Sequence, residues 1–218
     1  MFATLLHPAT KKIAFERAYP PSAAELFGHQ AETLRRLGLC TIEELAAAEE
    51  RIPLNAPFVF VPGKASHLGI AELVRYVGVS YGRAAGACRI EQVDHPVSTA
   101  GGDGGYFLTD YRDAFNRHEN MSESAQEHTT KLLRNRRSPL TAVELAFRLI
   151  YFPEALEEYQ FGAAGSSCRG GEHTPVFFIP HDGSGVPALD SFDFRHRSGC
   201  TLFPSCGERV RMNAPAKE

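Results

Sequence analysis

The chain has 218 residues, of which 43% are hydrophobic and 22% charged, and its formal net charge is -3 at pH 7. These proportions exclude wholesale disorder, and the length allows one large or two small domains with a buried core. The slight excess of acidic residues argues against a general nucleic-acid binder, which needs a basic excess.

Two short helices are predicted at the start of the ordered region. The patterns Ser22-x-x-Glu25 and Thr41-x-x-Glu44 are capping boxes, in which a hydroxyl and a carboxylate bond free backbone N–H groups at a helix start. Gly38 ends the first helix, so the pair forms a predicted helical hairpin. A DNA-reading helix-turn-helix is the alternative, but the second helix is acidic and would repel phosphate.

A buried strand is predicted at 57–62, Pro-Phe-Val-Phe-Val-Pro, because the run is short, aromatic and β-branched. A Gly-Lys pair then precedes a helix predicted at about 68–77, as in a phosphate-binding loop. Phe58 and Ala65 stand where that motif requires a glycine and a hydroxyl residue, so this interpretation is rejected. The glycine-rich stretch 100–105 is predicted to be a flexible loop, since it lacks the flanking strand and helix of a dinucleotide-binding fingerprint.

Helices and then strands are predicted in the second half of the chain. A strand is expected at 106–110, a helix at about 122–136, and another helix after the capping box Thr141-x-x-Glu144. Three further strands are expected near the C-terminus, at 175–180, 188–194 and 200–203. This segregation predicts an α+β fold, with an N-terminal helical hairpin, mixed central helices and strands, and a β-rich C-terminal region.

The expected domain organisation is an N-terminal extension at 1–19, one α+β domain at 20–211 and a flexible tail at 212–218. Within the domain, the helical and mixed part covers about 20–156 and the β-rich part about 157–211. No basic region precedes the N-terminal apolar patch, and no apolar run approaches the roughly twenty residues of a membrane span. Five cysteines, an odd number, do not form a disulfide framework, so free thiols in a reducing cytoplasm are predicted.

A succession of short motifs runs from about residue 20 to 211. The motifs are Glu25-Leu-Phe-Gly-His-Gln-Ala-Glu-Thr-Leu-Arg-Arg-Leu-Gly38, Ala56-Pro-Phe-Val-Phe-Val-Pro62, Gly105-Tyr-Phe-Leu-Thr-Asp110, Arg137-Ser-Pro-Leu-Thr-Ala-Val-Glu144, Phe152-Pro-Glu-Ala-Leu156, Gly165-Ser-Ser-Cys168, Thr174-Pro-Val-Phe-Phe-Ile179 and Ser205-Cys-Gly-Glu-Arg-Val210. In this order they resemble a family of bacterial proteins known only as a domain of unknown function. The resemblance implies a single compact domain and no particular activity. Family members tend to be tryptophan-rich near a C-terminal histidine, whereas this chain has no tryptophan.

Cysteine and histidine residues gather near the C-terminus and suggest a metal site. His196, Cys200 and Cys206 are the candidate ligands, because zinc favours thiolate and imidazole groups in a tetrahedron. Their irregular spacing lacks the tight C-x2-C pair of a zinc knuckle, and packed thiols are the simpler interpretation. No cofactor is therefore expected, and zinc is the alternative.

A thiol nucleophile is the second candidate chemistry. Cys168 lies beside Arg169, which favours a thiolate, and His173 or His181 could act as the base. The chain lacks a Gly-x-Ser-x-Gly pattern here, so an α/β-hydrolase nucleophile elbow is unsupported. An ordinary turn that needs glycine for positive φ is the competing interpretation.

Six polar or aromatic residues near loops are candidates for ligand binding: Ser166, Ser167, Arg169, Asp110, Arg112 and Phe194. Around Arg169, glycines allow backbone N–H groups to face an oxyanion or a phosphate. Asp110 and Asp113, with Arg112 between them, could hold a divalent cation or orient a hydroxyl-rich ligand, although such acids in loops are commonly just solvated.

Two functions are therefore considered. The first is a non-enzymatic binding or interaction module for a small ligand or a protein partner. Its apolar surface would come from aromatic residues, namely Phe152, Tyr159, Phe161, Phe192, Phe194 and Phe203. The second is a small thiol- or zinc-dependent hydrolase or transferase centred on Cys168 and the nearby histidines. The binding module is preferred, because no catalytic spacing is specific.

Overall fold

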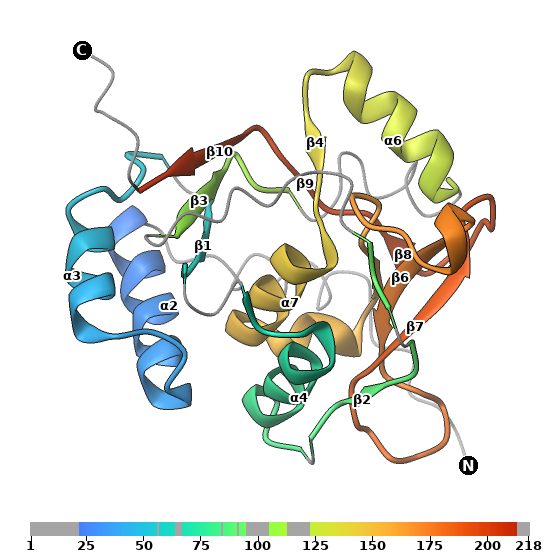
Figure 1. The fold of residues 1–218 in the computed structure, drawn as a ribbon, viewed down its shortest axis with the longest axis horizontal. Helices are drawn as coiled ribbons and strands as arrows, with labels where there is room; N and C mark the ends of the chain where they lie inside the picture. Colours follow the sequence, from blue (N-terminus) through green and yellow to red (C-terminus); the bar gives the residue numbers. More distant parts are fainter. Residues whose placement is uncertain are drawn as a thin grey trace, which may run out of the picture.

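The computed structural model describes residues 22–55, 57–63, 67–83, 85–90, 92–94, 105–112 and 123–212, and it confirms the α+β class (Figure 1). The α-helices of these residues are α2 (Ala23–Leu37), α3 (Ile42–Glu49), α4 (Ile70–Ser80), α6 (Ala125–Arg134) and α7 (Ala142–Tyr151). Two short 3-10 helices are η2 (Pro153–Glu157) and η3 (Arg169–Gly171). Each predicted α-helix is confirmed, with bounds that differ by a few residues.

The strands of the described residues form three sheets. An antiparallel sheet has the order β1-β3-β10, from Val59–Val61, Tyr106–Thr109 and Glu208–Arg211. A mixed sheet has the order β2-β7-β6-β5-β8, from Ala87–Cys88, Ala188–Asp193, His173–Phe178, Gln160–Gly162 and Thr201–Leu202. A two-stranded ladder pairs β4 (Ser138–Pro139) with β9 (Ser205–Cys206).

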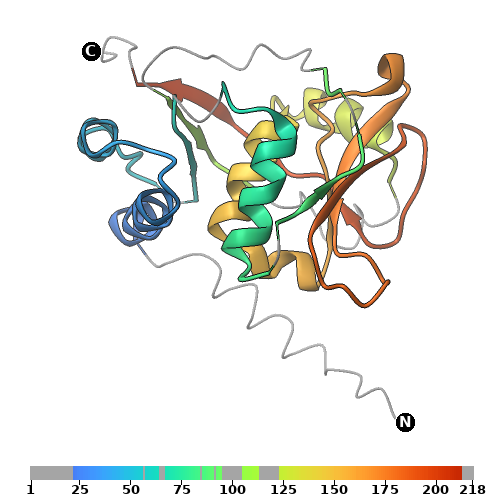
Figure 2. The ribbon, with the colours of Figure 1, turned by 60° about the horizontal axis from the view of Figure 1, so that its bottom comes forward.

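Helix α7 is the centre of the fold, and all ten of its residues are buried. Figure 2 shows α4 beside α7, with the three-stranded sheet on one side and the five-stranded sheet on the other. Even the charged residues Glu144 and Arg148 of α7 have 0% exposure. The Arg148 guanidinium lies 4.7 Å from the centroid of the Phe152 ring and donates to the Phe152 carbonyl at 3.4 Å. A buried charge of this kind is tolerated only where such contacts replace water.

Local capping by side chains explains where α2, α3, α6 and α7 start. Thr41 and Thr141 each form the predicted capping box, and the Ser22 hydroxyl accepts from the Glu25 N–H. Ser124 forms another box and starts α6. Gly38 ends α2 with φ of 68°, a left-handed conformation that glycine adopts without steric cost.

The strands predicted from apolar runs are confirmed as β1, β3, β6, β7 and β8, whereas β2, β4, β5, β9 and β10 were not predicted. The missed strands have only two to four residues each, too few to form a recognisable apolar run. The longest of them, β10, reads Glu-Arg-Val-Arg. The predicted extension at 1–19, residues 100–104 of the predicted loop and residues 213–218 of the predicted tail lie outside the described residues. So does Asp113 of the predicted cation site. No described helix has both the length and the apolar character needed to cross a membrane.

Candidate functional site

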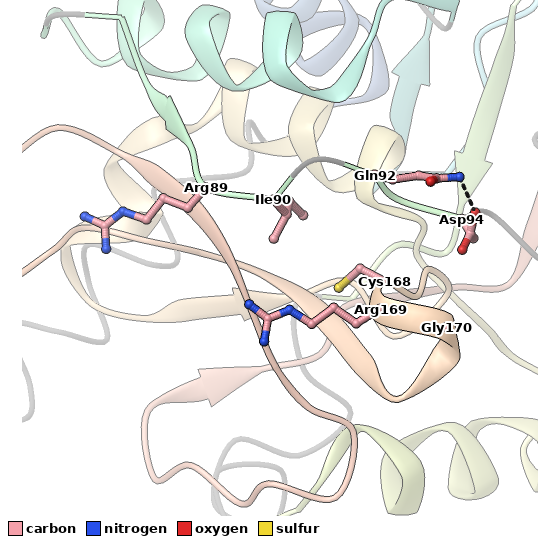
Figure 3. Close-up of a pocket in the computed structure, with 7 residues that line it drawn as sticks. All are labelled: Arg89, Ile90, Gln92, Asp94, Cys168, Arg169 and Gly170. Carbon is pink, nitrogen blue, oxygen red and sulfur yellow. Dashed lines mark hydrogen bonds between the residues drawn. The ribbon is translucent and has the colours of Figure 1, made fainter.

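A pocket of about 330 Å³ lies between the segment that follows β2 and the loop that precedes β6 (Figure 3). We call it the polar pocket. Its lining residues are Arg89, Ile90, Gln92, Asp94, Cys168, Arg169 and Gly170. Of these, Cys168 and Arg169 were predicted from the sequence as site residues.

Backbone pairing holds the two walls of the polar pocket together. Strand β2 runs parallel to β7, and the Arg89 N–H donates to the Leu189 carbonyl at 2.9 Å. Further along, Asp94 and Ser167 exchange two backbone hydrogen bonds, of 2.7 and 2.9 Å. Ser167 therefore acts through its backbone, and it places Cys168 and Arg169 opposite the 89–94 segment.

The loop after Ser167 is closed and conformationally unusual. Cys168 and His173 pair through their backbones, with N···O distances of 3.0 and 3.3 Å. Between them, Arg169, Gly170 and Gly171 all have positive φ, of 51°, 72° and 95°. Glycine adopts this region freely, but arginine does so at an energetic cost. Such strain occurs often at functional sites, and here it falls on the residue whose side chain lines the pocket.

The charges of the polar pocket are unevenly distributed. Figure 3 shows the guanidinium groups of Arg89 and Arg169 reaching to one side, with Gln92 and Asp94 at the other. Arg89 is 4.0 Å from the Asp190 carboxylate, a loose and partly exposed contact. Arg169 is exposed and makes no ion pair with any residue of the described segments. One side of the pocket is therefore cationic, and the other offers an amide and a carboxylate.

Cys168 forms part of the pocket wall but has the properties of an unreactive thiol. Its residue is 2% exposed, and its thiol points to the His173 carbonyl at 3.6 Å. Burial raises the pKa of Cys168, while Ser191 and the Arg169 charge oppose this only in part. No imidazole is hydrogen-bonded to this thiol among the described residues, and the His173 Nδ1 atom is buried without a hydrogen-bond partner there. The neutral thiol is therefore the stable form at pH 7.

The other predicted sulfur and imidazole groups lie in different places. His181 and Cys200 line a second pocket, beside η2. The ring of His196 packs edge-on against Phe192, with centroids 5.6 Å apart. Cys206 is fully buried, and burial raises its pKa to about 12. Across the described segments, no three His, Cys, Asp or Glu residues lie close enough to hold a metal ion. Zinc binding through His196, Cys200 and Cys206 stays a prediction.

The remaining predicted ligand-binding residues have structural contacts. The Ser166 hydroxyl accepts from the Ala142 N–H at 2.8 Å, at the start of α7. Asp110 forms an ion pair with Arg112 at 3.3 Å and a closer one with the buried Arg137. Phe194 is half-buried and packs in a small apolar cluster. These contacts serve the fold, and none of these four residues lines the polar pocket.

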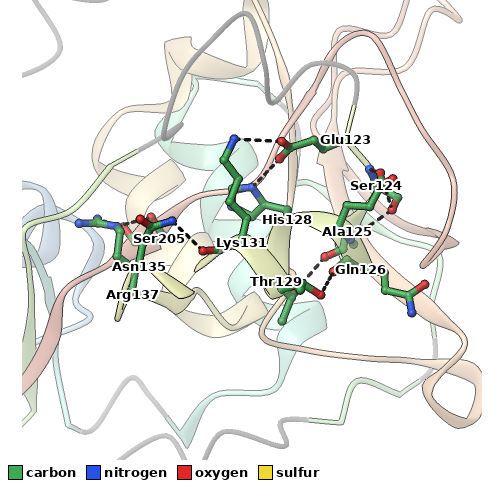
Figure 4. A network of polar contacts seen from close by, with 12 residues as sticks. Glu123, Ser124, Ala125, Gln126, His128, Thr129, Lys131, Asn135, Arg137 and Ser205 are labelled. Atoms are coloured by element: carbon green, nitrogen blue, oxygen red, sulfur yellow. Dashed lines mark hydrogen bonds and ion pairs between the residues drawn. The ribbon is translucent and has the colours of Figure 1, made fainter. Parts of the chain in front are cut away.

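A network of polar contacts, separate from the two pockets, surrounds the fully buried His128 on α6 (Figure 4). Its Nδ1 atom lies 3.3 Å from the Glu123 carboxylate, which also accepts from Lys131 at 3.1 Å. The imidazole packs on the Phe203 ring, and its Nε2 atom has no hydrogen-bond partner among the described residues. Burial lowers the pKa of His128, and Glu123 offsets this only in part.

Sequence reasoning missed five pocket residues: Arg89, Ile90, Gln92, Asp94 and Gly170. The segment from Arg89 to Asp94 reaches Cys168 only through the β2–β7 pairing and the bridge between Asp94 and Ser167. No local motif marks that approach. The sequence signal for a site was present only in the loop that precedes β6, where two glycines follow Arg169.

No protein-family model matches the chain, and no significant match occurs among the curated proteins or the solved structures. The resemblance to a bacterial family of unknown function therefore stays a prediction.

Proposed function

We propose that the protein is a non-enzymatic binding module that holds a small anionic ligand in the polar pocket. The observation that carries this proposal is the state of Arg169. Its backbone has φ of 51°, and its guanidinium shares a pocket with Arg89 while lacking an ion-pair partner among the described residues. Positive φ alone does not mark a site, because the exposed Arg136 has φ of 54° and does not line the pocket. Arg169 combines this strain with a side chain that lines a pocket beside a second arginine, and a bound ligand explains that combination.

The chemistry of the two cations indicates the ligand class. A guanidinium group presents several N–H donors in a planar fork that matches a carboxylate or a phosphate. Gly170 lines the pocket, and a Cβ added to it would meet no atom within 4 Å, so there is open space for a ligand beside Arg169. A volume of about 330 Å³ is in the range of small-molecule sites.

A thiol-dependent hydrolase or transferase is the second candidate, because Cys168 lines the same pocket. Such an enzyme needs a thiolate and a base within hydrogen-bond reach. The raised pKa of Cys168 disfavours the thiolate, and its thiol bonds a backbone carbonyl rather than an imidazole. Binding without catalysis is therefore the better-supported function.

Calorimetric titration with inorganic phosphate and with citrate tests the proposal. The informative variant is Arg169→Gly, which removes the guanidinium and also relieves the positive φ. We expect affinity for both anions to fall about tenfold or more, the effect of losing a charge-assisted bidentate contact. The same variant should gain about 0.5 to 1 kcal/mol in the free energy of unfolding, because glycine tolerates this conformation.

Arg136→Gly is the matched control, since Arg136 is also exposed and has φ of 54° but lies after α6. It should gain similar stability and bind both anions like the unmodified protein. Equal affinity of Arg169→Gly and Arg136→Gly for the two anions would refute the proposal, and so would an absence of binding to the unmodified protein.

A further inference from the structure

A second pocket, of about 350 Å³, lies beside η2 and the turn between β6 and β7. Its lining differs from that of the polar pocket. Leu156, Tyr159, Ile179 and Pro180 supply an apolar wall, and Glu158 supplies a carboxylate. No arginine or lysine lines it, so its charge is opposite in sign to that of the polar pocket.

The apolar wall is held in place by the core. Leu156 is 4% exposed, and the Tyr159 ring packs edge-on against the fully buried Phe161, with centroids 6.5 Å apart. The half-buried Ile179 follows β6 and also packs against the main core. These side chains are already ordered, so an apolar ligand would displace water from them without ordering a new surface.

The carboxylate is the second and independent feature. The Oε2 atom of Glu158 is buried but has no hydrogen-bond partner within the described part of the chain. Its neighbour Glu157 differs, because it accepts a hydrogen bond of 2.5 Å from the Tyr81 hydroxyl. No cation of the described segments pairs with the Glu158 carboxylate, and the residue is partly exposed and lines the pocket. A cationic N–H group of a ligand would therefore be stabilised beside this carboxylate.

We propose that this second pocket binds an organic ammonium ion with an apolar body. The ammonium N–H donates to Glu158, and the body packs against Leu156, Tyr159 and Ile179. A primary amine beside an aromatic ring, such as 2-phenylethylamine, fits this arrangement. The site is separate from the polar pocket and does not depend on the function proposed there.

Three probes of similar shape separate the contribution of charge from that of apolar packing. We expect 2-phenylethylamine to bind in a calorimetric titration, and the neutral 2-phenylethanol to bind about tenfold more weakly. The anionic 3-phenylpropionate, titrated into the Arg169→Gly variant so that the polar pocket does not contribute, should show no binding. The difference follows from the charge-assisted hydrogen bond to Glu158.

Glu158→Gln should weaken the binding of 2-phenylethylamine about tenfold and leave that of 2-phenylethanol unchanged. Because the Glu158 side chain has no ion-pair or hydrogen-bond partner among the described residues, the melting temperature without ligand should stay the same or rise, which separates lost binding from misfolding. Glu154→Gln is the matched control, since Glu154 is exposed on η2, which ends just before Glu158, and does not line the pocket. Similar affinities for the three probes, no binding of the amine, or unchanged amine affinity in Glu158→Gln would each overturn the proposal.

Discussion

Arg209 and Arg169 differ in what surrounds their guanidinium groups. Arg209 donates to the Glu144 carboxylate at 2.6 and 2.8 Å and to the Pro139 carbonyl at 2.9 Å. Arg169 reaches into the polar pocket and forms no ion pair within the described segments. One arginine therefore completes the interior of the fold, and the other stays available to a ligand.

The interior cluster around Glu144 shows how many hydrogen bonds a fully buried carboxylate accepts in this fold. Besides Arg209, the carboxylate accepts from the Tyr106 hydroxyl at 3.1 Å and from the Thr141 N–H at 2.8 Å. The nearby carboxylate also raises the pKa of Tyr106, although burial is the larger cause. A buried charge is tolerated only when hydrogen bonds of this number replace water. The arginines of the polar pocket have no comparable set of hydrogen bonds among the described residues. We therefore assign ligand binding to the pocket and stability to the interior cluster.

The largest expected effect comes from breaking the interior cluster. Glu144→Ala leaves the mostly buried Arg209 without its carboxylate and should lower the free energy of unfolding by about 3 to 5 kcal/mol. Glu32→Ala, which removes an exposed ion pair with Arg35, should change it by less than about 1 kcal/mol. Urea denaturation of both variants measures the contrast, and a loss below about 1 kcal/mol for Glu144→Ala would contradict the account.

A smaller loss is expected at Arg137. This buried residue donates to the Ser205 hydroxyl at 3.0 Å and forms an ion pair with the half-exposed Asp110. Arg137→Ala should cost about 2 kcal/mol, typical of buried hydrogen bonds to a charged group. Arg169→Ala should change stability by less than about 0.5 kcal/mol, as expected for an exposed side chain. If both variants lose the same stability, the distinction between interior and pocket arginines fails.

The pH dependence of the free energy of unfolding tests a second buried group, His128 on α6. Because burial lowers the pKa of His128 in the folded state, the unfolded chain takes up that proton first as pH falls. The free energy of unfolding should therefore be highest above the ordinary value of 6.5 and decrease below it, until the folded pKa is passed. Denaturation curves at a series of pH values should show a weaker decrease for His128→Gln. An identical decrease in the variant would exclude His128 as its source.

The smallest and most local effect concerns thiol accessibility. Cys200 is exposed and should react first with a thiol reagent at neutral pH. Cys206 has 0% exposure and a pKa raised to about 12, and it should react last. Cys168 should react slowly, and more slowly still when phosphate fills the polar pocket. Mapping the labelled peptides by mass spectrometry gives the order, and fast, selective labelling of Cys168 would instead favour the thiol-enzyme alternative.

The sequence predicted the elements whose causes are local. Capping boxes at Thr41 and Thr141 mark helix starts because both hydrogen bonds are made within four residues. The strand at Val59–Val61 was predictable because its apolar run is continuous. Strand β10 was not, since its polar residues carry no strand pattern and its strand form depends on pairing with the distant β3. Such pairing is a tertiary effect.

Only one wall of the polar pocket could be predicted, because its residues are neighbours in the sequence. Cys168 and Arg169 share one loop with glycines, which is a recognisable local pattern. Arg89 and Gln92 come from a distant segment whose position depends on the bridge between Asp94 and Ser167. The separation of His181 and Cys200 from the polar pocket likewise depends on how the hairpin of β6 and β7 folds, and no spacing in the sequence encodes it.

The most direct measurement is a nitrogen-15 NMR titration that follows the Nε–Hε signals of the arginines during addition of phosphate. We predict that the signals of Arg89 and Arg169 shift together and saturate with one dissociation constant, while those of the exposed Arg136 and Arg195 barely move. Small parallel shifts of all exposed arginines, or unchanged signals at Arg89 and Arg169, would contradict an anion site in the polar pocket.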